Sequence, residues 1–144
     1  MEFPHRPRCS PWGLLGAAMA LIAWGSPSHA VEPDNFRLNS TGDLVALCSA
    51  DPAGPDYTAA IHFCHGFASG AYQYYAMLAA AMPSARYVCV PEPAPSRSEA
   101  IAGFVEWARR NPGNTADKPV DSIFRYLSER YPCTPATASV GSPR

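Results

Sequence analysis

Four of the five cysteines, all except Cys9 near the N-terminus, limit most strongly how this chain can fold, because an even number of cysteines in a small exported protein is typical of disulfides. They are Cys48, Cys64, Cys89 and Cys133, and no two of them form the CxxC pair that is common in zinc sites. Zinc binding is the alternative to oxidation for such residues. The spacing favours two disulfides and predicts no metal site.

Export is predicted by the N-terminus, which has the order of a secretory signal peptide. A basic start precedes the uncharged run 13–24, which is too short to span a bilayer comfortably. The triplet Ser28-His29-Ala30 then places small residues at the two positions that a signal peptidase reads. An uncleaved membrane anchor is the alternative. We expect residues 1–30 to be removed by cleavage after Ala30, which also removes Cys9.

The remaining chain has a slightly acidic balance, with nine basic and eleven acidic residues after residue 30. This balance argues against nucleic acid or an anionic membrane surface as the partner. The C-terminal segment 134–144 has little apolar surface to bury and is predicted to be a disordered tail. We therefore expect one folded domain over residues 31–133, with no membrane contact after cleavage.

Apolar residues recur at steps of three and four in four segments, so the sequence predicts a small all-α domain of four helices. Capping boxes at Ser40 and Ser96 mark two helix starts, and Asp56 is a candidate cap for the longest helix. We expect a short helix between the Ser40 cap and the proline-rich run 51–55, and further helices over residues 57–82, 97–110 and 119–131. Prolines around Cys89 predict an extended segment, with residues 86–90 briefly strand-like.

An up-and-down order of these helices predicts how the cysteines pair. Cys48 ends the first helix and Cys64 lies about two turns into the second, at the same end of the bundle. Cys89 precedes the third helix and Cys133 follows the fourth, at the opposite end. We therefore expect Cys48–Cys64 and Cys89–Cys133 rather than the other two connectivities. Loop closure by these bonds would contribute about 3 and 4 kcal/mol to stability.

The longest predicted helix contains Gly66 and Gly70, each of which costs about 1 kcal/mol relative to alanine in a helix interior. Two glycines four residues apart leave a shallow groove along one helix face. The groove can receive either a neighbouring helix of the same fold or a partner protein. We expect the neighbouring helix.

No motif predicts catalysis. His62 and His65 share one helix face, but no acidic residue lies on that face to complete a metal site, and we interpret both as polar surface residues. The sequence contains no nucleophile elbow, phosphate loop or HExxH motif. We expect a protein that is not an enzyme and needs no cofactor.

Aromatic and arginine side chains are the best indication of function, because Tyr, Trp and Arg dominate protein–protein hot spots. Several aromatic residues crowd the second helix, and a tryptophan beside two arginines lies off the apolar stripe of the third. A dimer interface or a second face of the core is the alternative. The candidate partner-binding residues are Phe67, Tyr72, Tyr74, Trp107, Arg109 and Arg110.

Several short motifs occur in a fixed order along residues 40–133. They are Thr41-Gly42-Asp43-Leu44 before Cys48, Cys64-His65-Gly66-Phe67 with Gly70, Cys89-Val90-Pro91, Phe104-Val105 with Trp107, and Tyr131-Pro132-Cys133. Together they resemble the resistance-associated/type VI amidase immunity (Rap/Tai) family of bacterial periplasmic proteins.

This resemblance implies a small all-α fold, often homodimeric, in the periplasm. It also implies a protein partner, since characterised members neutralise a peptidoglycan amidase injected by a type VI secretion system by occluding its active site. The matching residues build the scaffold, so the resemblance assigns no partner-contacting position. A periplasmic acid-stress chaperone, which unmasks apolar surface when acid breaks a dimer, is the alternative function.

Cleavage after Ala30 makes a direct prediction. Mass spectrometry of the periplasmic fraction should find a form that begins at Val31. A form that begins at Met1 would contradict export.

Overall fold

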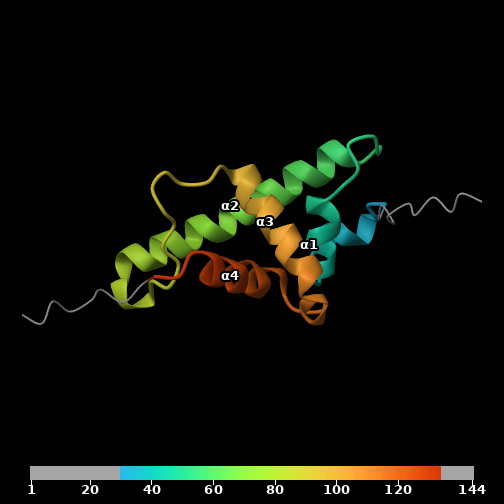
Figure 1. Ribbon diagram of the computed structural model, residues 1–144. Coiled ribbons are helices and arrows are strands. Elements are labelled where there is room, and N and C mark those ends of the chain that lie inside the picture. Colours follow the sequence, from blue (N-terminus) through green and yellow to red (C-terminus); the bar gives the residue numbers. More distant parts are fainter. Residues whose placement is uncertain (1–29, 134–144) are drawn as a thin grey trace, which may run out of the picture.

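A computed structural model describes residues 30–133, and helices dominate them (Figure 1). No strand forms in this range, where the one isolated bridge pairs Val88 with Pro132. The predicted all-α class is confirmed. The predicted signal peptide and C-terminal tail lie outside the described residues. The elements are η1 (Pro33–Arg37), α1 (Thr41–Cys48), α2 (Tyr57–Ala81), η2 (Pro83–Ala85), α3 (Arg97–Arg110), η3 (Pro112–Asn114) and α4 (Pro119–Arg130).

The helix starts confirm the capping boxes at Ser40 and Ser96. The Ser40 Oγ atom accepts a hydrogen bond from the Asp43 backbone N–H, and the Asp43 carboxylate accepts one from the Ser40 N–H at 2.9 Å. Burial would raise the pKa of Asp43, but hydrogen bonds from Asn35 and Ser40 outweigh it and lower that pKa. Asp56 occupies the N-cap position of α2 as predicted, but its side chain makes no capping hydrogen bond.

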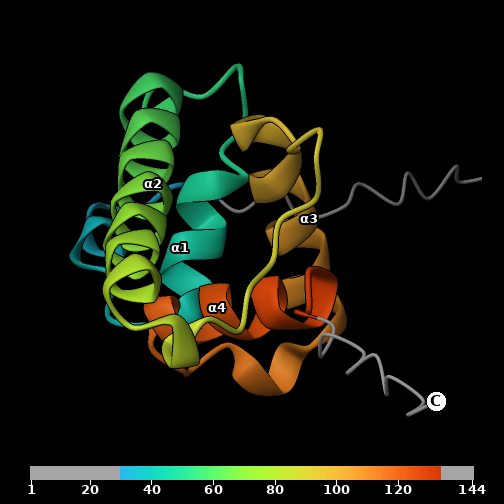
Figure 2. The same ribbon diagram turned by 90° about the vertical axis from the view of Figure 1, so that its left-hand side faces the viewer.

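The shortest of the four α-helices lies at the centre of the fold. α1 contacts α2, α3 and α4, and Figure 2 shows it between α2 and α3. Its side chains Leu44 and Leu47 are completely buried. Leu44 belongs to the cluster shared with α3 and α4, whereas Leu47 belongs to a second cluster with Ala60 and Cys64 of α2. α1 therefore joins the two parts of the core.

Hydrogen bonds attach the N-terminus of α1 to the segment just before α4 and to α4 itself. The backbone N–H of Thr41 donates to the Asp117 carbonyl at 2.8 Å, and that of Gly42 donates to the Thr115 carbonyl at 3.0 Å. The buried hydroxyls of Thr41 and Ser122 lie 2.7 Å apart and hydrogen-bond each other. These contacts satisfy N–H groups that the first turn of a helix leaves without partners.

Both predicted disulfides are confirmed, Cys48–Cys64 and Cys89–Cys133. The up-and-down order on which they were predicted holds only in part. α1 and α2 run in opposite directions, but α3 crosses α2 instead of lying alongside it (Figures 1 and 2). The reason is the proline-rich segment 86–96, which carries the chain back along the molecule before α3 begins.

The same segment is attached to α2 and to the end of the domain. The Tyr75 hydroxyl accepts hydrogen bonds from the backbone N–H groups of Tyr87 and Val88, at 2.9 and 2.8 Å. The Cys89 N–H donates to the Tyr131 carbonyl at 2.8 Å. Val88 also forms the bridge with Pro132, so the strand-like stretch expected over residues 86–90 is reduced to this one residue.

Two glycines predict opposite effects of the same substitution on stability. Gly103→Ala should lower the free energy of unfolding by about 1 kcal/mol, because its Cβ would press on the Tyr126 hydroxyl and lie 3.2 Å from Cζ. Gly66→Ala should raise the free energy of unfolding by about 1 kcal/mol, because alanine is the better helix former and its Cβ would meet nothing within 4 Å. Urea unfolding measures both, and a destabilised Gly66→Ala variant would contradict this packing.

Candidate partner-binding surface

α2 carries no Asp, Glu, Lys or Arg along its 25 residues, although only four of them are buried. Surface helices normally carry charged side chains on the face that points away from the core. Instead, the exposed side of α2 presents large apolar and aromatic groups. Tyr74 is 63% exposed and Met77 is 57% exposed, and Phe63 and Tyr72 are also exposed. Exposed apolar side chains without neighbouring charges make this helix a candidate interaction surface.

One flank of α2 is a shallow groove over the two glycines, which we call the glycine groove. It is lined by Phe63, Gly66, Phe67, Gly70 and Ala71 of α2 and by Val120 of α4. A Cβ atom placed on either glycine would meet no atom within 4 Å. The expectation that a neighbouring helix fills this groove was wrong, because α4 only borders it through Val120, and no helix of the described fold packs onto the two glycines. The groove is open to a partner.

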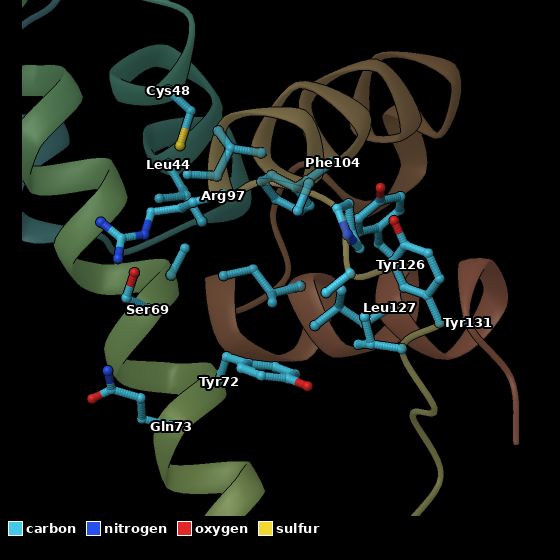
Figure 3. Close-up of a pocket in the computed structure, with 17 residues that line it drawn as sticks. Leu44, Cys48, Ser69, Tyr72, Gln73, Arg97, Phe104, Tyr126, Leu127 and Tyr131 are labelled. Carbon is cyan, nitrogen blue, oxygen red and sulfur yellow. The ribbon is translucent and has the colours of Figure 1, made fainter. Parts of the chain in front are cut away.

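The other flank of α2 borders a deeper cavity of about 320 Å³, which we call the α2–α3 pocket (Figure 3). Its walls come from all four α-helices and from the proline-rich segment 86–96 between α2 and α3. The side chains of Leu44, Phe104 and Leu127 form its apolar interior, and Arg97 lies at its edge. Burial raises the pKa of Tyr126 in the pocket wall, and the neighbouring Tyr131 raises this pKa further.

Three of the candidate partner-binding residues lie on α2, but on two different flanks of the helix. Phe67 lines the glycine groove, Tyr72 lines the α2–α3 pocket, and Tyr74 is the most exposed large aromatic of the helix. The candidates did not include Phe63, Met77 and Val120, which are also exposed. The absence of charge from Tyr57 to Ala81 was the signal in the sequence that could have identified this surface.

The expectation that Trp107 lies on the surface was wrong. Its side chain is 6% exposed, its ring stacks on Phe104, and its Nε1–H donates a hydrogen bond to the Glu129 carboxylate at 2.6 Å. The physical reason is that α4 packs against α3 and widens the buried face of α3 beyond its regular apolar stripe. Trp107 therefore belongs to the core and not to the binding surface.

Arg109 and Arg110 are exposed at the C-terminal end of α3, and neither lines the groove or the pocket. Arg110 pairs with Glu106 on its own helix at 3.0 Å. Both partners of this pair are largely exposed, so it contributes at most about 1 kcal/mol. The structure thus places Phe67 and Tyr74 on the groove side of α2 and Tyr72 on the opposite flank beside the pocket, and it leaves the two arginines apart from all three.

His62 is exposed on α2 and His65 is half-buried. Among residues 30–133, no group of three or more His, Cys, Asp or Glu side chains is placed to hold a metal ion. In the same range, no helix is long and apolar enough to cross a membrane.

The fold defines a small disulfide-bonded helical protein whose longest helix has an exposed side without charge. The model of the Rap1a immunity protein family matches residues 40–133, and the chain belongs to this family. Comparisons with curated proteins and with solved structures find no match. Membership implies a protein effector as the partner and an immunity-protein-like role, and proteins of this family are typically periplasmic.

The position of Trp107 predicts a loss of stability rather than of binding. Trp107→Ala should lower the free energy of unfolding by about 3–5 kcal/mol, because it leaves a cavity between α3 and α4. Trp107→Phe should cost less, since it keeps most of the ring and loses the hydrogen bond to Glu129. Thermal and urea unfolding of both variants measure this. An unchanged melting temperature in Trp107→Ala would contradict its place in the core.

Proposed function

We propose that the protein neutralises a peptidoglycan amidase effector of a type VI secretion system by binding it with the exposed face of α2 and occluding its active site. The observation that carries the proposal is the long helix without charge, whose exposed Phe63, Tyr74 and Met77 lie in line along one side. Aromatic and methionine side chains are enriched in the centres of protein interfaces. Family membership supports an effector as the partner.

The way α2 is held supports binding without rearrangement. The disulfide from Cys64 to Cys48 and the Tyr75 hydroxyl hydrogen bonds fix the inner side of the helix. Phe63, at one end of the glycine groove, packs edge-to-face against Phe36 of η1 with ring centroids 5.4 Å apart. A surface that is already ordered loses little conformational entropy on binding. We infer that the protein acts by binding and not by catalysis.

The location of the partner fits the predicted export. We propose that cleavage after Ala30 releases the domain 31–133 into the periplasm, where an injected amidase meets its substrate. Two disulfides suit that oxidising compartment.

A matched set of charge insertions tests the binding face. Tyr74→Asp and Met77→Asp should each weaken binding of an amidase encoded beside this gene by roughly 30-fold, because a carboxylate would be desolvated in an apolar interface. Ala102→Asp is the control, since Ala102 is an exposed position in the middle of α3 that lines neither the groove nor the pocket. Calorimetry and inhibition of peptidoglycan hydrolysis measure the effect.

Equal inhibition by wild type, Tyr74→Asp and Met77→Asp would contradict the proposed face. Arg109→Ala and Arg110→Ala then test whether the interface lies on α3 instead. If no neighbouring amidase is bound by the wild type, the amidase assignment itself fails.

A second copy of the chain is another protein that the glycine groove could receive, and the resemblance implies homodimers. Sedimentation of the wild type and of Gly70→Trp distinguishes the two uses. If the wild type is a dimer and Gly70→Trp dissociates it, the groove is the dimer interface. If Gly70→Trp keeps the oligomeric state of the wild type and no longer binds the effector, the groove is the effector-binding site.

A further inference from the structure

The α2–α3 pocket is independent of the proposed effector-binding face. Its α2 residues Ala68, Ser69, Tyr72 and Gln73 lie on the flank of the helix opposite the glycine groove. Its interior is built from buried side chains of the core, among them Ile101 and Phe104. An apolar cavity of about 320 Å³ is within the range of small-ligand sites in proteins.

The lining has one charged side chain, that of Arg97 at the start of α3. Arg97 takes part in no ion pair among the described residues, as is also true of Arg86, Arg109, Lys118 and Arg130, and it differs from these in lining the pocket. Figure 3 shows the guanidinium group reaching across the edge of the pocket toward Ser69 of α2, so the charge lies beside the opening and not within the apolar interior. The arrangement is an apolar cavity with one cation at its rim.

The nearest acid in the same helix does not neutralise this cation. The Glu99 carboxylate turns back to accept a hydrogen bond from the Ser96 N–H at 2.8 Å, and the Ser96 hydrogen bonds lower the pKa of Glu99. Arg97 also occupies the first turn of α3, where a helix favours negative and not positive charge. A cation at this position adds nothing to helix stability, which leaves its guanidinium free to bind an anion.

We propose that the α2–α3 pocket binds a small amphiphile with an aliphatic chain and a carboxylate head group, such as a medium-chain fatty acid. The chain would lie along Leu44, Phe104 and Leu127, where few polar atoms could satisfy a polar ligand. The carboxylate would remain at the edge and accept hydrogen bonds from the fork-shaped guanidinium of Arg97. A flexible chain fills an irregular cavity and restores the dispersion contacts that the empty walls lack.

Calorimetric titration with sodium dodecanoate below its critical micelle concentration tests the proposal. The protein is recovered after export with its own leader. We expect saturable binding of one molecule per chain, and roughly five-fold weaker binding of dodecyltrimethylammonium, which has the same chain and the opposite head charge. Absence of saturable dodecanoate binding, or equal affinity for the two amphiphiles, would overturn the proposal.

Two arginine variants isolate the role of the rim. Arg97→Gln should weaken dodecanoate binding about five-fold and leave dodecyltrimethylammonium binding no weaker, because only the head-group contact is lost. Arg109→Gln is the matched control, since Arg109 is exposed near the other end of α3 and does not line the pocket. Equal losses in the two variants would show a general charge effect and overturn the assignment to Arg97.

A filling variant tests the cavity. Ala100→Phe places a ring in the pocket from α3, where Ala100 is half-buried, and should abolish dodecanoate binding while helicity is retained. Undiminished binding by a folded Ala100→Phe variant would overturn the site. If this variant does not fold, the Arg97→Gln and Arg109→Gln pair still decides.

Discussion

α1 is held at both of its ends, and the arrangement of the other helices depends on this. At its N-terminus the buried hydroxyl of Thr41 bonds that of Ser122, and two backbone N–H groups bond carbonyls before α4. At its C-terminus the Cys48–Cys64 disulfide joins it to α2. An isolated helix of eight residues is not stable in water. These attachments, with complete burial of Leu44 and Leu47, make it the centre of the core.

The attachment of α2 through its inner side explains why its outer side can carry function. Cys64 and Tyr75 face the core and supply the disulfide and the hydroxyl hydrogen bonds that fix the helix. A Cβ atom on Gly66 or Gly70 would meet no other atom within 4 Å in the described fold. The lower helix propensity of these glycines is therefore not offset by closer helix packing within the domain. An open glycine pair of this kind allows the backbone of another protein to approach the helix closely.

The extended segment between α2 and α3 produces the second hollow of the molecule. It is fixed by Cys89–Cys133 at one end and by the capped start of α3 at the other, and it spans the opening between α2 and α3 instead of filling it. Val90 and Pro95 therefore become walls of a cavity. A helix in that place would have packed its side chains inward and closed the space.

The sequence by itself determined the helices and their limits, since caps, prolines and apolar spacing act over a few residues. It also determined the disulfides, because few cysteines leave few pairings. Only the tertiary structure decided which faces are covered. Trp107 is buried because α4 packs beside it, and Gly66 is open because α3 crosses α2 elsewhere. Both outcomes depend on how helices that are distant in sequence pack against one another. The spacing of apolar residues predicts which side of a helix is buried, but it does not predict how wide the buried side is.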